Sequence, residues 1–206
     1  VPWLFGKEIE IPEEWEVKLL SEISEVIDSR HYTPTYMENG LSLILPNNVT
    51  ELGLNLDNTK YTTIEDYEKL IAGNRKPHED DIIYTRNASF GVANQVKKNQ
   101  IFSLGQDLVL IKSKQIVPFL LYLILNSKII IHQLDRLVSG STFKRINLVL
   151  IRSFIILLPP LPEQQKIASI LSNIDSKITS QEQYKEKLEK LKKSLMQKLL
   201  TGEVRV

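Results

Sequence analysis

An arginine and an asparagine stand side by side at Arg86-Asn87, in a polar loop that is expected to follow a strand. A guanidinium can donate two hydrogen bonds to a guanine edge, and a side-chain amide can bond an adenine edge in the same bidentate way. Ser89 adds a hydroxyl to the same loop. This loop is therefore a candidate for base recognition in duplex DNA. The alternative is that Arg86 forms an internal ion pair with Asp80 or Asp81.

A second loop, over 139–147, combines small hydroxyl residues with cations. Ser141 and Thr142 precede the basic pair Lys144-Arg145. Small residues let a backbone approach a phosphate closely, and the two cations can neutralise it. A loop that merely joined a helix to a strand would explain the glycine and serines but not the basic pair, so phosphate contact is favoured.

Two shorter polar turns are also candidates for DNA contact. Asn47-Asn48 follows a proline at the end of an expected strand, and Lys97-Lys98 is expected in a turn between strands. Lysines in such a turn can face phosphate. The two asparagines are equally well explained as ordinary turn residues.

The inventory of residues argues against an enzyme. There is no glycine-rich phosphate loop ending in Lys-Ser/Thr and no Gly-x-Ser-x-Gly elbow. Pro159-Pro160 follows Leu158, where the adenine methyltransferase motif needs Asn, Asp or Ser. Three widely separated histidines and no cysteine make a metal site improbable. We therefore expect no catalytic residue, no metal and no cofactor.

Length and composition set wider bounds. A chain of 206 residues with 42% hydrophobic and 25% charged residues forms one large domain, or a domain with an appendage. No apolar run is long enough to cross a membrane and no signal peptide is evident, so we expect a cytoplasmic protein, which the absence of cysteine also suits.

The charge balance bears on how the chain could bind DNA. The formal net charge is +1, and residues 163–206 hold 9 Lys and Arg against 6 Asp and Glu, which leaves 17 against 19 in the residues before them. If the front part binds DNA, it must therefore use a local patch of positive charge, because its overall charge does not attract DNA.

The apolar pattern of the front part mixes helical and strand periods, which predicts an α+β domain over residues 1–158. The expected elements are a short amphipathic helix over 19–27, a strand over 41–45, a helix over 64–71, a strand from 82, a strand pair over 102–111, a buried helix over 120–131 and a fully buried last strand over 151–158.

The remaining residues, 159–206, predict one long helix after a stiff proline segment. Its apolar residues follow a 4-3-4 spacing, and a second 4-3-4 run follows after a six-residue step. At 1.5 Å per residue the helix spans roughly 55 Å, too long to bury its stripe on a domain of this size, so we expect it to pair with another long helix. The expected dimer interface is Ile167, Leu171, Ile174, Ile178, Tyr184, Leu188, Leu191, Leu195 and Leu199.

Five segments together resemble type I restriction-modification specificity subunits. Leu158-Pro159-Pro160-Leu161-Pro162-Glu163-Gln164-Gln165-Lys166-Ile167 and the exit Leu199-Leu200-Thr201-Gly202-Glu203-Val204-Arg205 bracket the helix as in the conserved region of that family. Ile11-Pro12-Glu13-Glu14-Trp15-Glu16 is similar to the start of its recognition domains. The loops at 79–91 and 139–147 are similar to two of its loops, although Asn87-Ala88 departs from the usual Thr-Gly.

The resemblance implies one target recognition domain, 1–158, and one spacer helix, 159–206. Family members carry two such halves with their helices packed antiparallel, so this chain is either a half-subunit that forms a homodimer, which is favoured, or a piece of a longer protein. It implies a DNA-binding subunit without chemistry of its own. That subunit would recognise a two-part site in double-stranded DNA and position methyltransferase and nuclease-translocase partners.

Two other interpretations stay open. One is a generic coiled-coil dimer whose front domain binds protein. The other is a recognition fragment cut from a fused nuclease-methyltransferase. Salt dependence of DNA affinity separates the first from the DNA-binding interpretation, since phosphate contacts make affinity fall steeply with salt.

Overall fold

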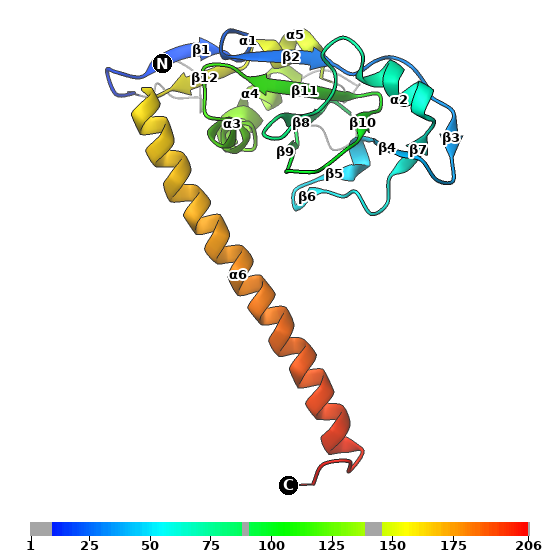
Figure 1. The fold of residues 1–206 in the computed structure, drawn as a ribbon. Coiled ribbons are helices and arrows are strands. Elements are labelled where there is room, and N and C mark those ends of the chain that lie inside the picture. The colour runs from blue at the N-terminus through cyan, green and yellow to red at the C-terminus, as the bar shows by residue number, and fades with distance from the viewer. Residues whose placement is uncertain (1–9, 88–90, 139–145, 206) are drawn as a thin grey trace. The chain divides into compact units, whose positions relative to one another are not determined.

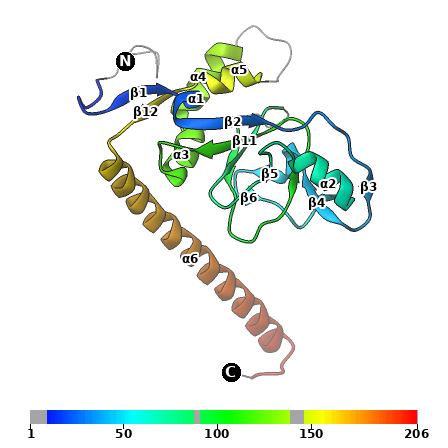
Figure 2. The same cartoon turned by 45° about the horizontal axis from the view of Figure 1, so that its top comes forward.

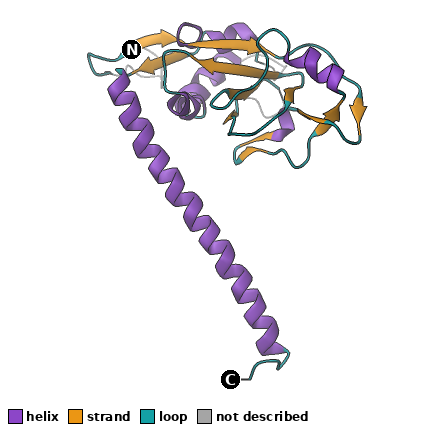
Figure 3. Cartoon of the chain, viewed as in Figure 1, coloured by secondary structure: helices purple, strands orange, loops and turns teal. Residues whose placement is uncertain are grey.

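The computed structural model describes residues 10–87, 91–138 and 146–205. Contacts within the chain divide it into two units, Val1–Gln164 and Gln165–Val206, and each is described here by itself. The first unit combines short strands with short helices and the second is helical, as Figure 3 shows, so the predicted α+β class with a long C-terminal helix is confirmed.

The strands of the first unit are mostly short. They are β1 (Glu16–Leu19), β2 (Ser24–Asp28), β3 (Tyr36–Met37), β4 (Leu41–Ile44), β5 (Val49–Thr50), β6 (Gly53–Leu54), β7 (Lys60–Thr62), β8 (Ile82–Thr85), β9 (Ala93–Gln95), β10 (Ser103–Leu104), β11 (Leu108–Ser113) and β12 (Ile155–Leu158). The helices are α1 (Leu20–Ile23), η1 (Pro46–Asn48), α2 (Ile64–Ile71), α3 (Pro118–Leu125), α4 (Lys128–Val138), α5 (Leu148–Arg152) and α6 (Leu161–Leu200).

The core lies on an antiparallel sheet of order β2-β11-β8-β9 (Figure 1). Its two central strands are buried except for the last two residues of β11, Lys112 and Ser113, and exposure is 0% for every residue from Leu108 to Ile111 and for Ile82 and Ile83. Such continuous apolar runs are typical of strands that are covered on both faces. α3 packs against β9 and β11, and α5 packs against β2.

A second four-stranded sheet has the order β10-β4-β7-β3, and β10 runs parallel to β4. The backbone N–H of Gly105, directly after β10, donates to the carbonyl of Ile44 at the end of β4 (2.8 Å). A Cβ at Gly105 would overlap Leu45 Cδ2 and lie 3.0 Å from Ile44 O, so a larger residue would require the Leu45 side chain and this carbonyl to shift. The turns that follow β4 and β10 are thereby held side by side.

The strand over 41–45, the helix over 64–71 and the strand from 82 are confirmed as β4, α2 and β8. The expected helix over 19–27 is wrong beyond its first turn, because α1 ends at Ile23 and β2 begins at Ser24. Val26 and Ile27 are β-branched and pair in β2 with the central strand β11, and this tertiary pairing overrides the helical spacing of the apolar residues.

Three further expectations are corrected. β10 and β11 do not pair with each other but belong to different sheets. The helix over 120–131 is broken into α3 and α4 at Asn126, whose side-chain amide bonds both the N–H (3.0 Å) and the carbonyl (3.1 Å) of Ala93 in β9. The last strand was expected over 151–158 and fully buried. It begins only at Ile155 and pairs with β1, and Ile151 and Arg152 belong to α5 instead. Ile155 and Leu157 are only half-buried.

The Glu-Gln pair after the prolines is tied into the first unit. Gln164 is 2% exposed; its Oε1 accepts from the N–H of Val117 (2.9 Å) and its Nε2 donates to the carbonyl of Pro159 (2.9 Å). Trp15 Nε1 donates to Glu163 Oε2 (3.0 Å). These side chains explain why the residues at the start of α6 belong to the first unit.

The second unit is the rest of α6 and the turn after it. α6 has 40 residues without interruption (Figure 2), which corresponds to about 60 Å at 1.5 Å per residue. It ends as predicted, since Gly202 has a left-handed φ of 73° and its N–H donates to Leu199 O. No helix among the described residues is long and apolar enough to span a membrane.

Candidate nucleic-acid interface

Polar turns meet at one edge of the second sheet. Because β4 and β10 are parallel, the turns after their carboxyl ends lie together and border a surface hollow of about 450 Å³. The hollow is lined by Tyr32, Thr33, Pro34, Tyr36, Leu43, Leu45, Pro46, Asn47, Gly105, Gln106 and Asp107. Asn47 and Gln106 are exposed there, so their amides are available to an outside partner.

The two predicted asparagines have different surroundings. Asn48 is 4% exposed, its Oδ1 accepts from the N–H of Leu45 (2.9 Å), and its Nδ2 donates to the carbonyls of Asn55 (3.1 Å) and Asn58 (2.9 Å). The Asn48 side chain uses these hydrogen bonds to hold the turn, so the structure favours the interpretation of Asn48 as an ordinary turn residue. Asn47 points outward and stays a candidate for DNA contact.

Arg86 lies directly after β8 and is only 6% exposed. Its Nη1 lies 2.5 Å from Asp28 Oδ1 at the end of β2, and its Nε donates to the carbonyl of Ile146 (2.9 Å). The expected alternative of an internal ion pair is therefore the one that this geometry favours, with Asp28 as the partner in place of Asp80 or Asp81. The buried guanidinium links the end of β2 to the residue after segment 139–145, and its contact with a base stays a prediction from the sequence.

The position of Arg86 joins the two predicted DNA loops. Its backbone carbonyl accepts from the N–H of Ile146, and its backbone N–H donates to the carbonyl of Asp107 (both 2.9 Å). Asn87 is exposed, and its Nδ2 lies 3.3 Å from Asp107 Oδ2. The loop after β8, the turn before β11 and the residue that follows segment 139–145 are thus held together.

Lys97-Lys98 does not share this location. Both lysines are exposed in the turn after β9, whose strand runs antiparallel to β8. The N–H of Asp80 donates to Val96 O (3.0 Å), which places this turn at the start of β8, whereas Arg86 follows its end. The lysine pair would need a separate stretch of phosphate backbone.

The other predicted contact residues, Ser89, Ser141, Thr142, Lys144 and Arg145, lie outside the residues that the structure describes. Their DNA contacts stay predictions from the sequence.

Two side chains beside the hollow were not among the predicted contacts. Tyr36 is 51% exposed, with the ammonium of Lys60 6.0 Å from its ring centre, and Gln106 Nε2 donates to Thr33 Oγ1 (3.2 Å). An aromatic ring beside a cation suits contact with nucleic acid. The polar pair Gln106-Asp107 between two apolar runs was a signal in the sequence, but nothing local marks Tyr36.

Asp66 of α2 fixes the segment that carries these aromatic residues. It accepts from Tyr32 Oη (2.6 Å) and from the N–H of Thr35 (2.8 Å). The Tyr32 hydrogen bond, followed by that from Thr35, holds the pKa of the Asp66 carboxyl below its ordinary value, so the carboxylate keeps accepting both bonds at neutral pH.

The acidic turn before β8 has a structural role. Asp81 Oδ2 accepts from the N–H of His78 (2.8 Å) and lies 3.8 Å from Lys112 Nζ, while burial raises the pKa of the Asp81 carboxyl. Among the described residues, no group of three or more His, Cys, Asp or Glu side chains could hold a metal ion.

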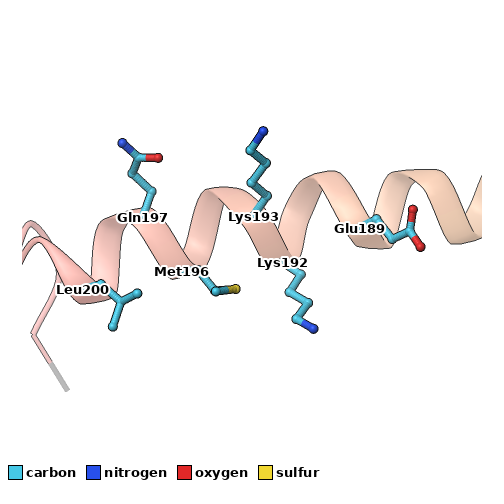
Figure 4. A pocket seen from close by; sticks show the side chains of 6 residues that line it. All are labelled: Glu189, Lys192, Lys193, Met196, Gln197 and Leu200. Atoms are coloured by element: carbon cyan, nitrogen blue, oxygen red, sulfur yellow. The ribbon is translucent and has the colours of Figure 1, made fainter.

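The apolar stripe of α6 is exposed along its length. From Leu171 to Leu199 the exposed fractions of the eight stripe side chains lie between 37% and 59%, and Ile167 is half-buried. A shallow hollow of about 320 Å³ lies near the end of α6, lined by Glu189, Lys192, Lys193, Met196, Gln197 and Leu200 (Figure 4). All six side chains project from one helix, so nothing encloses a ligand there.

Comparison with known proteins connects these features. The family described as type I restriction modification DNA specificity domain matches residues 12–190. The type I restriction enzyme MjaVIII specificity subunit of Methanocaldococcus jannaschii is 29% identical over 96% of this chain and 48% of its own length. The putative type I restriction enzyme MjaX specificity subunit of the same organism is 31% identical over 93% of this chain and 47% of its own length.

Solved structures share the fold. The HsdS subunit from Thermoanaerobacter tengcongensis has a TM-score of 0.60 at 18% identity, over 92% of this chain and 46% of its own. A structure described as showing complex assembly and conformational transition of the type I R-M system has a TM-score of 0.63 at 21% identity, with the same coverage of both chains. The chain thus spans about half the length of the curated relatives and structures that it matches.

Proposed function

The chain belongs to the family of type I restriction modification DNA specificity domains, and from this premise we propose that it is the sequence-specific DNA-binding subunit, or half-subunit, of a type I restriction-modification system. The observation that carries the proposal is the family match over residues 12–190, which includes the whole described front unit after Ile11 and most of α6. The relatives that match over nearly the whole chain are specificity subunits by name.

In this proposal, residues 1–158 recognise one half of a two-part site in double-stranded DNA. The exposed side chains that converge beside the hollow, Asn47, Asn87 and Gln106, contact base edges. Arg86 holds the two loops together, and Lys144-Arg145 contacts phosphate. Lys97-Lys98 contacts phosphate farther along the duplex.

Residues 159–206 pair with a second copy to give a homodimer with two recognition domains. Support comes from the exposed stripe on α6, because a soluble protein rarely leaves so long an apolar surface uncovered. A twofold dimer recognises two inverted half-sites around an unread gap. The dimer in turn positions a methyltransferase and a nuclease-translocase subunit on the site.

Selection from a randomised duplex library tests the proposal. The 206-residue protein should enrich two inverted half-sites at a fixed spacing, and its affinity should fall steeply between 50 and 200 mM salt, as expected for several phosphate contacts. Enrichment of no sequence, with weak and salt-independent binding, would contradict it. Addition of a cognate methyltransferase should then place methyl groups within the selected half-sites.

A further inference from the structure

From Ile167 to Leu195 the apolar stripe of α6 is symmetric about one polar residue. Counting outward from Gln181, stripe residues stand three, seven, ten and fourteen positions away on both sides. On the N-terminal side they are Ile178, Ile174, Leu171 and Ile167, and on the C-terminal side they are Tyr184, Leu188, Leu191 and Leu195. Gln181 itself continues the spacing of both halves and is exposed. The six-residue step between Ile178 and Tyr184 therefore consists of two three-residue steps that meet at Gln181.

From this symmetry we propose that α6 pairs antiparallel with a second copy in one register, with the twofold axis at Gln181. The inference rests on the proposed homodimer, whose antiparallel orientation the family resemblance already implies, and adds the register of the pairing and the residue that fixes it. In this register the stripe residues from Ile167 to Leu195 face stripe residues of the second copy, whereas Leu199 lies opposite Glu163. Ile174 faces Leu188, and Ile178 faces Tyr184, whereas Gln181 faces Gln181.

A regular heptad stripe would not define a single register. Strict 4-3 alternation maps onto itself after any shift of seven residues, so two such helices can slide. Here a shift of seven places Gln181 opposite Leu188 or Ile174 and leaves an amide without a partner in an apolar layer, which is unfavourable. At the twofold axis the two amides can hydrogen-bond each other, since each carries both a donor and an acceptor.

The charges favour the antiparallel orientation. Residues 182–200 contain six lysines and three glutamates, whereas residues 163–180 contain two lysines and two acidic residues. A parallel pair would bring the two cationic halves together along their whole length. An antiparallel pair brings each cationic half against a neutral one and also opposes the two helix dipoles.

Single cysteines test the register directly, because the chain has no cysteine of its own. Gln181→Cys should cross-link to its own copy under oxidation or with a short thiol linker. Ile174→Cys and Leu188→Cys should not cross-link alone, since each would lie about 21 Å from its own copy, fourteen residues along the helix. A mixture of the two variants should cross-link. Ile174→Cys mixed with Leu195→Cys, a shift of seven residues, should not.

Each alternative outcome has a definite meaning. Self-cross-linking of both Ile174→Cys and Leu188→Cys would overturn the antiparallel orientation. Self-cross-linking of only one of them, or cross-linking of the Ile174→Cys and Leu195→Cys mixture, would overturn the register. No cross-link in any variant, including Gln181→Cys, would overturn self-pairing. Sedimentation and the duplex selection on the unaltered protein are separate readouts. If the protein is a DNA-binding dimer but gives the wrong cross-links, the proposed function stands and the register is refuted. If it gives the expected cross-links but does not bind DNA, the register stands and the proposed function is refuted.

The role of Gln181 has its own test. Gln181→Leu should tighten the dimer at least tenfold and let additional registers form, so that the Ile174→Cys and Leu195→Cys mixture now cross-links, because a buried polar residue fixes register at the expense of affinity. Thr179→Leu adds a leucine off the stripe and should change neither property. A weaker dimer, or an unchanged cross-linking pattern, in Gln181→Leu would overturn the role given to this amide.

Discussion

Replacing Arg86 by alanine separates a residue that recognises a base from one that positions two loops. In the structure the side chain is buried and bonded to Asp28 and to the carbonyl of Ile146. Loss of one partner from a buried ion pair destabilises a protein by about 3–5 kcal/mol. The Asp28 side chain is 26% exposed, so solvent screening reduces this destabilisation. The Ile146 carbonyl loses its hydrogen-bond donor, which increases it. We expect Arg86→Ala to lower the free energy of unfolding by about 3 kcal/mol.

Thermal unfolding at fixed protein concentration measures this loss. For a chain of this size about 3 kcal/mol corresponds to a decrease in Tm of roughly 6–12 °C. The double variant Arg86→Ala/Asp28→Asn removes the unpaired carboxylate and should recover about 1–2 kcal/mol. Arg30→Ala is the matched control, because Arg30 is exposed and donates to a single backbone carbonyl, that of Lys69. It should change Tm by no more than a few degrees.

The DNA affinity of the same variant completes the test. If Arg86 positions the loops, Arg86→Ala should weaken binding to all half-site variants alike, measured well below the new Tm. If Arg86 contacts a base, stability should be unchanged and discrimination should be lost at one base pair, worth about 1–3 kcal/mol. Unchanged stability with relaxed specificity would refute the structural argument.

Three further predictions address the helix and the loops. Leu191→Asp should give a folded monomer with much weaker DNA binding, because a carboxylate opposes burial of the stripe, whereas Lys193→Asp, off the stripe, should stay dimeric in sedimentation. Lys144→Ala should weaken binding to all sequences alike and reduce the slope of log affinity against log salt by about one, and an unchanged slope would exclude a phosphate contact. Inserting four residues between Ile178 and Tyr184 adds roughly 6 Å of rise and about 40° of rotation, so the same half-sites should be selected with a gap about two base pairs longer. Strong binding with the original gap would contradict the helix as a spacer.

The sequence predicted elements well where pattern and local chemistry agreed. α2 has a Thr63 cap that accepts from the Asp66 N–H, acidic residues in its first turn and a glycine after its end, and its bounds were predicted correctly. α6 was equally clear from its prolines, its stripe and Gly202. Such agreement between signals is what makes a segment predictable without its neighbours.

Prediction failed where distant partners decided the outcome. The residues of β2 become a strand because β11 lies beside them, and no local signal announces that strand. The break between α3 and α4 depends on the amide of Asn126, which bonds a residue 33 positions away in β9. Arg86 is similar: its partner Asp28 lies 58 positions earlier, beyond what loop composition can indicate.

The arrangement of turns on rigid strand ends has a consequence for how this protein can change over evolution. Gly105, Arg86 and Asn48 fix the turns through backbone contacts, and substitutions there alter the frame itself. Asn47, Asn87 and Gln106 project outward from the same turns. If these three side chains contact bases as proposed, mutations there alter the recognised sequence while leaving the core intact. A library randomised there should consist mainly of folded proteins with diverged targets, and new specificities would arise by single steps without passing through an unfolded intermediate.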